Sequence, residues 1–244
     1  MKGILIILEK ELKDYFTTSL FYIILTAFSF VIGYFFFNYL INVKEFTTVT
    51  VLTNVVTPLF GNINLLVLIL SPLLTMKIFS QESRDGTLDL LLGSNLKYYE
   101  IILGKFLSIM TIIFVLLTYC SFVPITLHFI GYDNPYLFFT SFVGLFFCAS
   151  FYISIGILAS SITSNQILSS FLSYGGILFF IFLIQPARAT SNYIVKSALQ
   201  YLSVSYHYDY FAKGAVASYS LIYFVSMIFI FLFITSIVLS KRKW

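Results

Sequence analysis

Charged residues are absent from five long stretches of the sequence, and this spacing constrains the fold more than any other feature. The stretches run over residues 15–43, 46–76, 106–132, 134–187 and 214–240. A helix needs about 20 mostly apolar residues to cross the ~30 Å hydrocarbon core of a bilayer. Four stretches hold 27 to 31 residues and fit one span each, whereas the stretch of 54 residues fits two. The spacing therefore predicts six transmembrane helices.

The composition agrees with this reading of the charges. Only 24 of the 244 residues are Lys, Arg, Asp or Glu, which is 10%, and 59% are hydrophobic. An ordinary soluble domain has about 25% charged residues. A soluble fold cannot cover so much apolar surface with so few charges. The chain is therefore predicted to be an all-α integral membrane protein, and a soluble enzyme, a nucleic-acid-binding protein and a disordered chain are excluded.

The longest stretch is divided by a polar segment, Ser160–Gln166, that we expect to separate two helices. After it, the apolar segment 185–213 is long for a loop, and we expect it to form short helices in the outer leaflet, shielded by protein. Residues 20–244 then form one transmembrane domain. Its spans are predicted at about 20–40, 59–79, 106–129, 137–162, 167–184 and 219–239.

The basic residues indicate how the chain is oriented in the membrane. If the N-terminus is cytoplasmic, ten Lys and Arg residues fall on the inner side of the six spans and four on the outer side. Short cytoplasmic segments carry an excess of Lys and Arg. We therefore expect a multi-pass protein of the plasma (inner) membrane with both termini in the cytoplasm. The first span is too long for the apolar region of a cleavable signal peptide.

The segment 1–19 precedes the first span and has a pattern of its own. Apolar residues recur at helical spacing opposite Lys2, Glu9, Lys10 and Lys13, although Ile6 and Ile7 interrupt the stripe. Such a pattern is typical of an amphipathic helix that lies in the membrane interface. The alternative is a simple cytoplasmic extension of the first span.

Residues that could support catalysis are sparse. No charge lies deep in a predicted span, where it would cost about 2.5–3.5 kcal/mol and would indicate an ion or proton relay. This argues against a proton-driven transporter. Gly104-Lys105 lacks the other residues of a P-loop, so no nucleotide site is expected. His207 and Asp209 could form a general-base pair, but an aromatic anchor at the outer interface is favoured because tyrosines surround them. We therefore predict that the chain is not an enzyme and binds no metal or cofactor.

The segment 80–95, between the second and third spans, carries the strongest functional signal. Asp85 or Thr87 can cap a short helix that Gly93 can end. A helix of two turns is unstable alone in water, so its apolar stripe needs a partner or the bilayer surface. We predict that it docks a cytoplasmic subunit. The candidate docking residues are Glu82, Arg84, Asp85, Gly86, Thr87, Leu88, Asp89, Leu91 and Leu92.

Small residues recur at a spacing of four in the fourth and fifth spans. They include the pairs Ser150–Ser154, Gly156–Ser160 and Ser169–Ser173, with Gly175-Gly176 after them. Such faces allow helices to approach closely. They can serve packing within one subunit, or an interface between subunits or a substrate path.

Two neighbouring segments carry a likeness to a known family. The first runs from Glu82 through Gly86-Thr87-Leu88-Asp89-Leu90-Leu91-Leu92, and the second is Tyr99–Leu107, which contains Gly104-Lys105. Together they resemble the membrane subunits of ABC-2 type ATP-binding cassette transporters. The likeness is to the gliding-motility-like and NosY-like permeases. In these permeases Glu is usual where this chain has Asp89, and a proline commonly follows the Leu run near Asn95. Six spans with an amphipathic start fit the same family.

The resemblance implies a coupling helix in the segment 80–95 and a separate ATPase subunit that binds ATP and Mg. It also implies a second permease subunit, identical or related, and transport in the direction of export. Two other classes stay open. One is a structural or assembly membrane protein without transport activity, and the other is a secondary transporter.

Overall fold

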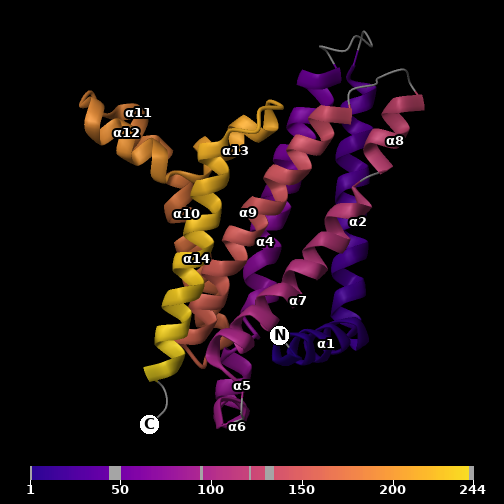
Figure 1. Ribbon diagram of the computed structural model, residues 1–244. Helices are drawn as coiled ribbons and strands as arrows, with labels where there is room; N and C mark the ends of the chain where they lie inside the picture. Colours follow the sequence, from indigo (N-terminus) through magenta and orange to yellow (C-terminus); the bar gives the residue numbers. More distant parts are fainter. Residues whose placement is uncertain (1, 44–50, 94–95, 121, 130–134, 242–244) are drawn as a thin grey trace.

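The computed structural model describes residues 2–43, 51–93, 96–120, 122–129 and 135–241, and its long helices form one bundle (Figure 1). No β-strand occurs within these ranges. Six of the described helical segments are long and apolar enough to cross a membrane, which confirms the predicted all-α membrane class. The long helices are α2 (Ser19–Ile41), α4 (Thr57–Thr75), α7 (Tyr98–Tyr119), α9 (Pro135–Ile162), α10 (Gln166–Phe182) and α14 (Ser218–Lys241).

The polar segment Ser160–Gln166 separates two helices, as predicted. Helix α9 ends at Ile162 and α10 begins at Gln166. Asn165 fixes the start of α10, because its side-chain oxygen accepts hydrogen bonds from the backbone N–H groups of Ile167 (2.9 Å) and Leu168 (3.4 Å). This is the N-cap geometry that Asn favours.

The third long helix does not have the predicted bounds of 106–129. Helix α7 begins at Tyr98 and ends at Tyr119, and the remainder forms a separate helix, α8 (Phe122–Phe129). Two features explain the difference. Glu100 stabilises the early start, since its carboxylate accepts the backbone N–H of Lys97 at 3.3 Å. The break lies before Pro124, because proline has no backbone N–H to donate to the carbonyl of Cys120, four residues earlier, and so cannot continue α7.

Short helices lie at both ends of the bundle (Figure 1). Helices α5 (Ser80–Arg84) and α6 (Thr87–Gly93) lie at the end to which α14 returns. The π-helix η1 (Leu52–Val56) precedes α4 at the other end. Also near that end are α8, α11 (Ile184–Ala189), α12 (Tyr193–Leu202) and α13 (Val204–Ala212). The last three are the short helices expected in the segment 185–213, but α12 has no buried residue, so the rest of the chain does not shield it as expected.

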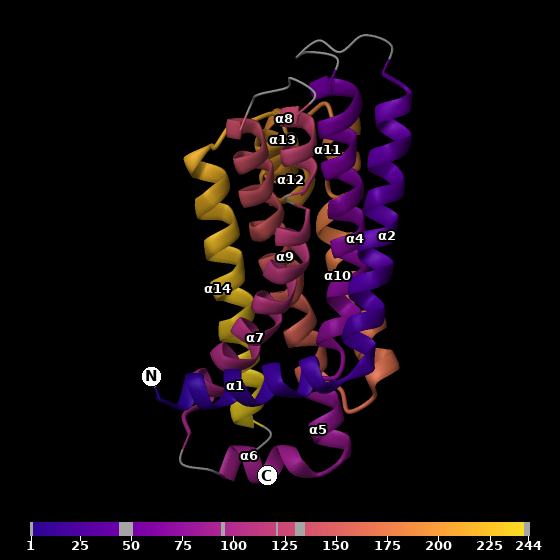
Figure 2. The same ribbon diagram turned by 90° about the vertical axis from the view of Figure 1, so that its right-hand side faces the viewer.

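Helix α1 (Lys2–Thr17) lies across one end of the bundle, close to the start of α7 (Figure 2). The two helices touch through glycines. A Cβ atom added at Gly104 would lie 2.8 Å from the Cβ of Ile7, and one at Gly3 would lie 2.9 Å from Oε2 of Glu100. Ile7, which interrupts the expected apolar stripe, is buried, whereas Leu5, which belongs to that stripe, is exposed. The face of α1 that packs on the protein is therefore rotated about the helix axis relative to the expected stripe.

The core is built around α9, which contacts α4, α7, α10, α13 and α14. The small residues of α9 serve packing within the chain. A Cβ atom at Gly156 would lie 2.7 Å from the Cβ of Thr75 on α4, and Ser150, Ser154 and Ser160 are buried. By contrast, α2, α10 and α14 leave many apolar side chains exposed, as expected for helices in lipid.

Candidate functional site

The candidate site is the α5–α6 loop, residues 80–93, at the end of the bundle where α1 lies (Figure 2). Asp85 and Gly86 join the two short helices, and Gly86 has a φ of 71°. Only glycine adopts this conformation readily, because a Cβ atom would crowd the backbone there. Glycine at position 86 therefore suits the turn between the two helices. Residues 94 and 95, which belong to the predicted docking segment, lie outside the described residues.

The loop does not present the apolar face that the sequence suggested. Leu88 is only 3% exposed and Leu92 is also buried, so both contribute to the chain's own core, and Leu91 is half-buried. Leu90 is instead 77% exposed. The expectation that Leu88 offers its side chain to a partner is corrected, because the neighbouring apolar surface of the same chain already covers it.

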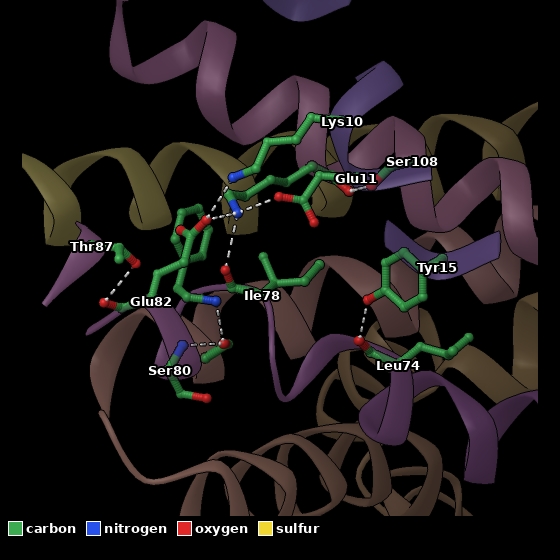
Figure 3. Close-up of polar contacts among 12 residues, drawn as sticks. Lys10, Glu11, Tyr15, Leu74, Ile78, Ser80, Glu82, Thr87 and Ser108 are labelled. Carbon is green, nitrogen blue, oxygen red and sulfur yellow. Dashed lines mark hydrogen bonds and ion pairs between the residues drawn. The ribbon is translucent and has the colours of Figure 1, made fainter. Parts of the chain in front are cut away.

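The polar residues predicted for docking divide into two groups. Arg84, Asp85, Thr87 and Asp89 are exposed, and Arg84 Nε lies 3.3 Å from the Asp85 carboxylate. Exposed pairs of this kind contribute little to stability. Glu82 instead turns toward the bundle and joins a cluster of charges (Figure 3). The loop therefore has one exposed side, with Leu90 among charged residues, and one side attached to the rest of the protein.

A buried lysine lies at the centre of the attached side. Lys105, on α7, is 1% exposed, and its Nζ donates to Glu11 Oε1 at 2.7 Å and to Glu82 Oε1 at 2.8 Å. It also donates to the carbonyl of Ile78 at 3.1 Å. Lys10 Nζ lies 3.8 Å from Glu82. We call Lys10, Glu11, Glu82 and Lys105 the ion cluster; it holds two positive and two negative side chains.

The ion cluster joins three parts of the chain. Glu11 comes from α1, Glu82 from α5 and Lys105 from α7 (Figure 3). A buried ammonium is costly unless oxygen atoms satisfy its donors, and here three acceptors do so. The phenyl ring of Phe79 adds a cation–π contact, with its centroid 5.2 Å from Lys105 Nζ.

The start of α5 is also held by α9. The hydroxyl of Ser160 accepts hydrogen bonds from the backbone N–H groups of Phe79 (3.0 Å) and Ser80 (3.1 Å). Nearby, Tyr15 of α1 donates to the carbonyl of Leu74 near the end of α4, at 2.8 Å (Figure 3). The base of the α5–α6 loop is thus fixed to the bundle, whereas its far side is exposed.

Sequence reasoning identified Glu82 but missed Glu11, Lys105 and Ser160. Lys105 was treated as a charge flanking a span that began at residue 106, and Ser160 as part of a polar boundary. A signal was present in Gly104-Lys105. A glycine inside a helix permits close approach of a second helix, and a neighbouring lysine can then be enclosed.

A second polar group lies at the far end of the bundle, around His207 on α13. The ring is buried and stacks on Tyr223 with centroids 4.0 Å apart. Its Nε2 lies 2.8 Å from the carbonyl of Tyr201, and its Nδ1 lies 3.0 Å from the hydroxyl of Ser220. A carbonyl only accepts, so Nε2 carries the proton and Nδ1 accepts from Ser220. His207 therefore bonds to these groups and not to Asp209, as a structural anchor would.

Acid should destabilise this end of the protein. Burial lowers the pKa of His207 below its ordinary value near 6.5. An opened state would bind a proton at the ordinary pKa, before the folded state does, so stability is complete above pH 6.5 and falls as the pH drops below it. We expect the unfolding midpoint to drop more between pH 7.5 and 5.5 in the unmodified chain than in His207→Gln, whose amide can keep both hydrogen bonds. Equal pH dependence in the two chains would contradict this assignment.

Within the described residues, no group of three or more His, Cys, Asp or Glu side chains could hold a metal ion. Cys120 and Cys148 are both free and buried. In comparisons with known proteins, the chain matches no family model. A search of curated proteins gives no match either.

Proposed function

We propose that the chain is the membrane-spanning permease subunit of an ABC-2 type ATP-binding cassette transporter. A separate ATPase subunit, which binds ATP and Mg, docks on the α5–α6 loop and powers transport, with export as the expected direction. In this arrangement the α1 end of the bundle and both termini face the cytoplasm, and the protein resides in the plasma membrane.

The observation that carries the proposal is the two-sided construction of the α5–α6 loop. Its outer side exposes Leu90 together with Arg84, Asp85 and Asp89, a mixture of one apolar side chain and charges that suits a partner protein. Its inner side is attached to α1 by the Lys10–Glu82 ion pair, to α7 by Lys105 and to α9 by Ser160. A loop that receives force from a partner needs both features. The likeness of Glu82–Leu92 to ABC-2 permeases supports the same conclusion.

A second permease subunit completes the proposed transporter, with the substrate path between the two. Of the two adjacent glycines on α10, Gly176 already packs inside the chain, since a Cβ atom there would lie 2.9 Å from Ile155. Gly175 is exposed, and apart from the local helix backbone and the adjacent residues no atom lies within 4 Å of its would-be Cβ. The exposed face of α10 around Gly175 is therefore the part of this region that we assign to the dimer.

Replacing Leu90 by Ser should weaken recovery of the ATPase that a neighbouring gene encodes. The substitution removes an exposed apolar side chain from the proposed interface, and we expect a loss of about 1–2 kcal/mol, or roughly five- to thirtyfold in affinity. The fold should be unchanged because Leu90 is not part of the core. The measurement is co-purification of the ATPase from membranes, with the affinity determined in lipid discs.

Ile194→Ser is the matched control, because Ile194 is equally exposed, at 77%, but lies on α12 at the far end of the bundle. It should recover the ATPase normally. An equal loss with both variants, or no loss with either, would count against docking at the α5–α6 loop. If the unmodified chain recovers no ATPase, the alternative of a structural or assembly protein without transport is favoured.

A further inference from the structure

We propose that Lys105 is a positioning residue that makes α1 move together with the α5–α6 loop. Its two carboxylate partners come from different elements, Glu11 on α1 and Glu82 on α5. Neither carboxylate belongs to α7, which carries the lysine. The proposal rests on the permease function only for its consequence in transport, and its structural content can be tested on the chain alone.

The charged groups around Lys105 are largely buried. Lys105 is 1% exposed, and the side chains of Glu11 and Glu82 are 12% and 17% exposed. The ammonium and the two carboxylates are thus shielded from water and salt. Ionic attraction is stronger in such a buried environment than at the surface. If α1 or α5 moved away alone, Lys105 would lose one carboxylate while staying buried. Such separation is strongly disfavoured, so both elements are expected to move with α7.

Other contacts also link α7 to α1 and to the start of α5. On the α1 side, Gly104 lets α7 approach Ile7 closely. On the α5 side, Lys105 also donates to the carbonyl of Ile78, just before α5 begins. The ion cluster therefore occupies the position where a displacement of the α5–α6 loop would reach both α1 and α7. In the proposed transporter, α1 would be part of the machinery that transmits ATPase closure to the membrane.

The coupling between α1 and the α5–α6 loop should be reciprocal. If Lys105 couples the two elements, weakening either carboxylate must affect the other element as well, because coupling between two sites acts equally in both directions. Within the described residues, the second oxygen of Glu82, Oε2, is buried and has no hydrogen-bond partner. Glu82 thus depends on Lys105 and Lys10 for its stabilisation, and its state should report on the whole cluster.

The test is hydrogen exchange of the full chain in lipid discs, with backbone amides of α1 and of α5–α6 followed separately. We expect Glu11→Gln to raise exchange in α5–α6, and Glu82→Gln to raise exchange in α1, each by at least about tenfold. Lys105→Met should raise both. Lys97→Met is the control, since Lys97 is an exposed lysine immediately before α7, and it should change neither.

Exchange that rises only in the element carrying the substitution would overturn the proposal, as would an equal response to Lys97→Met. The two glutamine variants keep the test decisive if Lys105→Met does not fold. When the ATPase is present, Glu11→Gln should leave its recovery intact but reduce substrate-stimulated hydrolysis. Failure of the ATPase to bind the unmodified chain would refute the permease function without touching the exchange result, so the two failures are distinguishable.

Discussion

Gly156→Val should destabilise the bundle by about 2–3 kcal/mol, because it forces extra atoms into the close contact between α9 and α4. A Cβ atom at Gly156 would lie 2.7 Å from the Cβ of Thr75 and 2.9 Å from its Cγ2. Thr75 is buried, and its hydroxyl donates to the carbonyl of Ser71 at 2.8 Å, which holds its side chain in place. Helix α9 is central to the core, so relief by moving it would disturb several neighbours. The measurement is the unfolding midpoint in mixed micelles.

Gly33→Val is the control for this steric argument. Gly33 lies in the long helix α2, and apart from the local helix backbone and the adjacent residues no atom is found within 4 Å of its would-be Cβ. The two variants share the change in helix propensity, so a difference between them reports on the contact with Thr75. Gly156→Ala combined with Thr75→Gly, which removes the Cβ of residue 75, should cost less stability than the sum of the two single substitutions. If Gly156→Val and Gly33→Val are equally stable, the close contact between α4 and α9 is not as described.

The distribution of charges was sufficient to predict the membrane class and the number of long apolar helices. Burying a charge in hydrocarbon is so costly that transmembrane helices exclude charges, and an apolar stretch of about 20 uncharged residues is therefore typical of such a helix. The polar segment around Asn165 also located a helix boundary correctly, because Asn at that position caps α10. In both cases the physical cause lies in residues that are close together in the sequence, so the amino-acid sequence alone is enough to detect it.

Contacts between distant segments could not be predicted in this way. Lys105 appeared to limit a span, yet Glu11 and Glu82, which lie 94 and 23 positions away in sequence, allow it to be buried within α7. Leu88 appeared available to a partner because periodicity shows that a helix has an apolar face, but not which surface covers it. The same limit applies to α1, whose buried face is set by its contact with Gly104.

Gly86→Val, in the turn between α5 and α6, should strongly weaken docking of the ATPase. Gly86 has a φ of 71°, and apart from the local backbone and the adjacent residues no atom lies within 4 Å of its would-be Cβ. Space is therefore not limiting, and the penalty comes from the backbone alone. An L-residue costs about 1–2 kcal/mol in this conformation, and a β-branched residue costs more. The turn should adopt another geometry, which would change the direction of α6 and of Leu90.

We expect recovery of the ATPase to fall by about tenfold or more, which corresponds to ~1.4 kcal/mol. The stability of the bundle should change little, because the loop lies outside the long helices. Gly86→Asn is the matched control, since asparagine tolerates positive φ better than other residues with a side chain. It should retain most of the docking. If Val and Asn at position 86 recover the ATPase equally well, the direction of α6 is not what the partner recognises. A loss with both variants would point instead to a side-chain clash with the partner at Gly86.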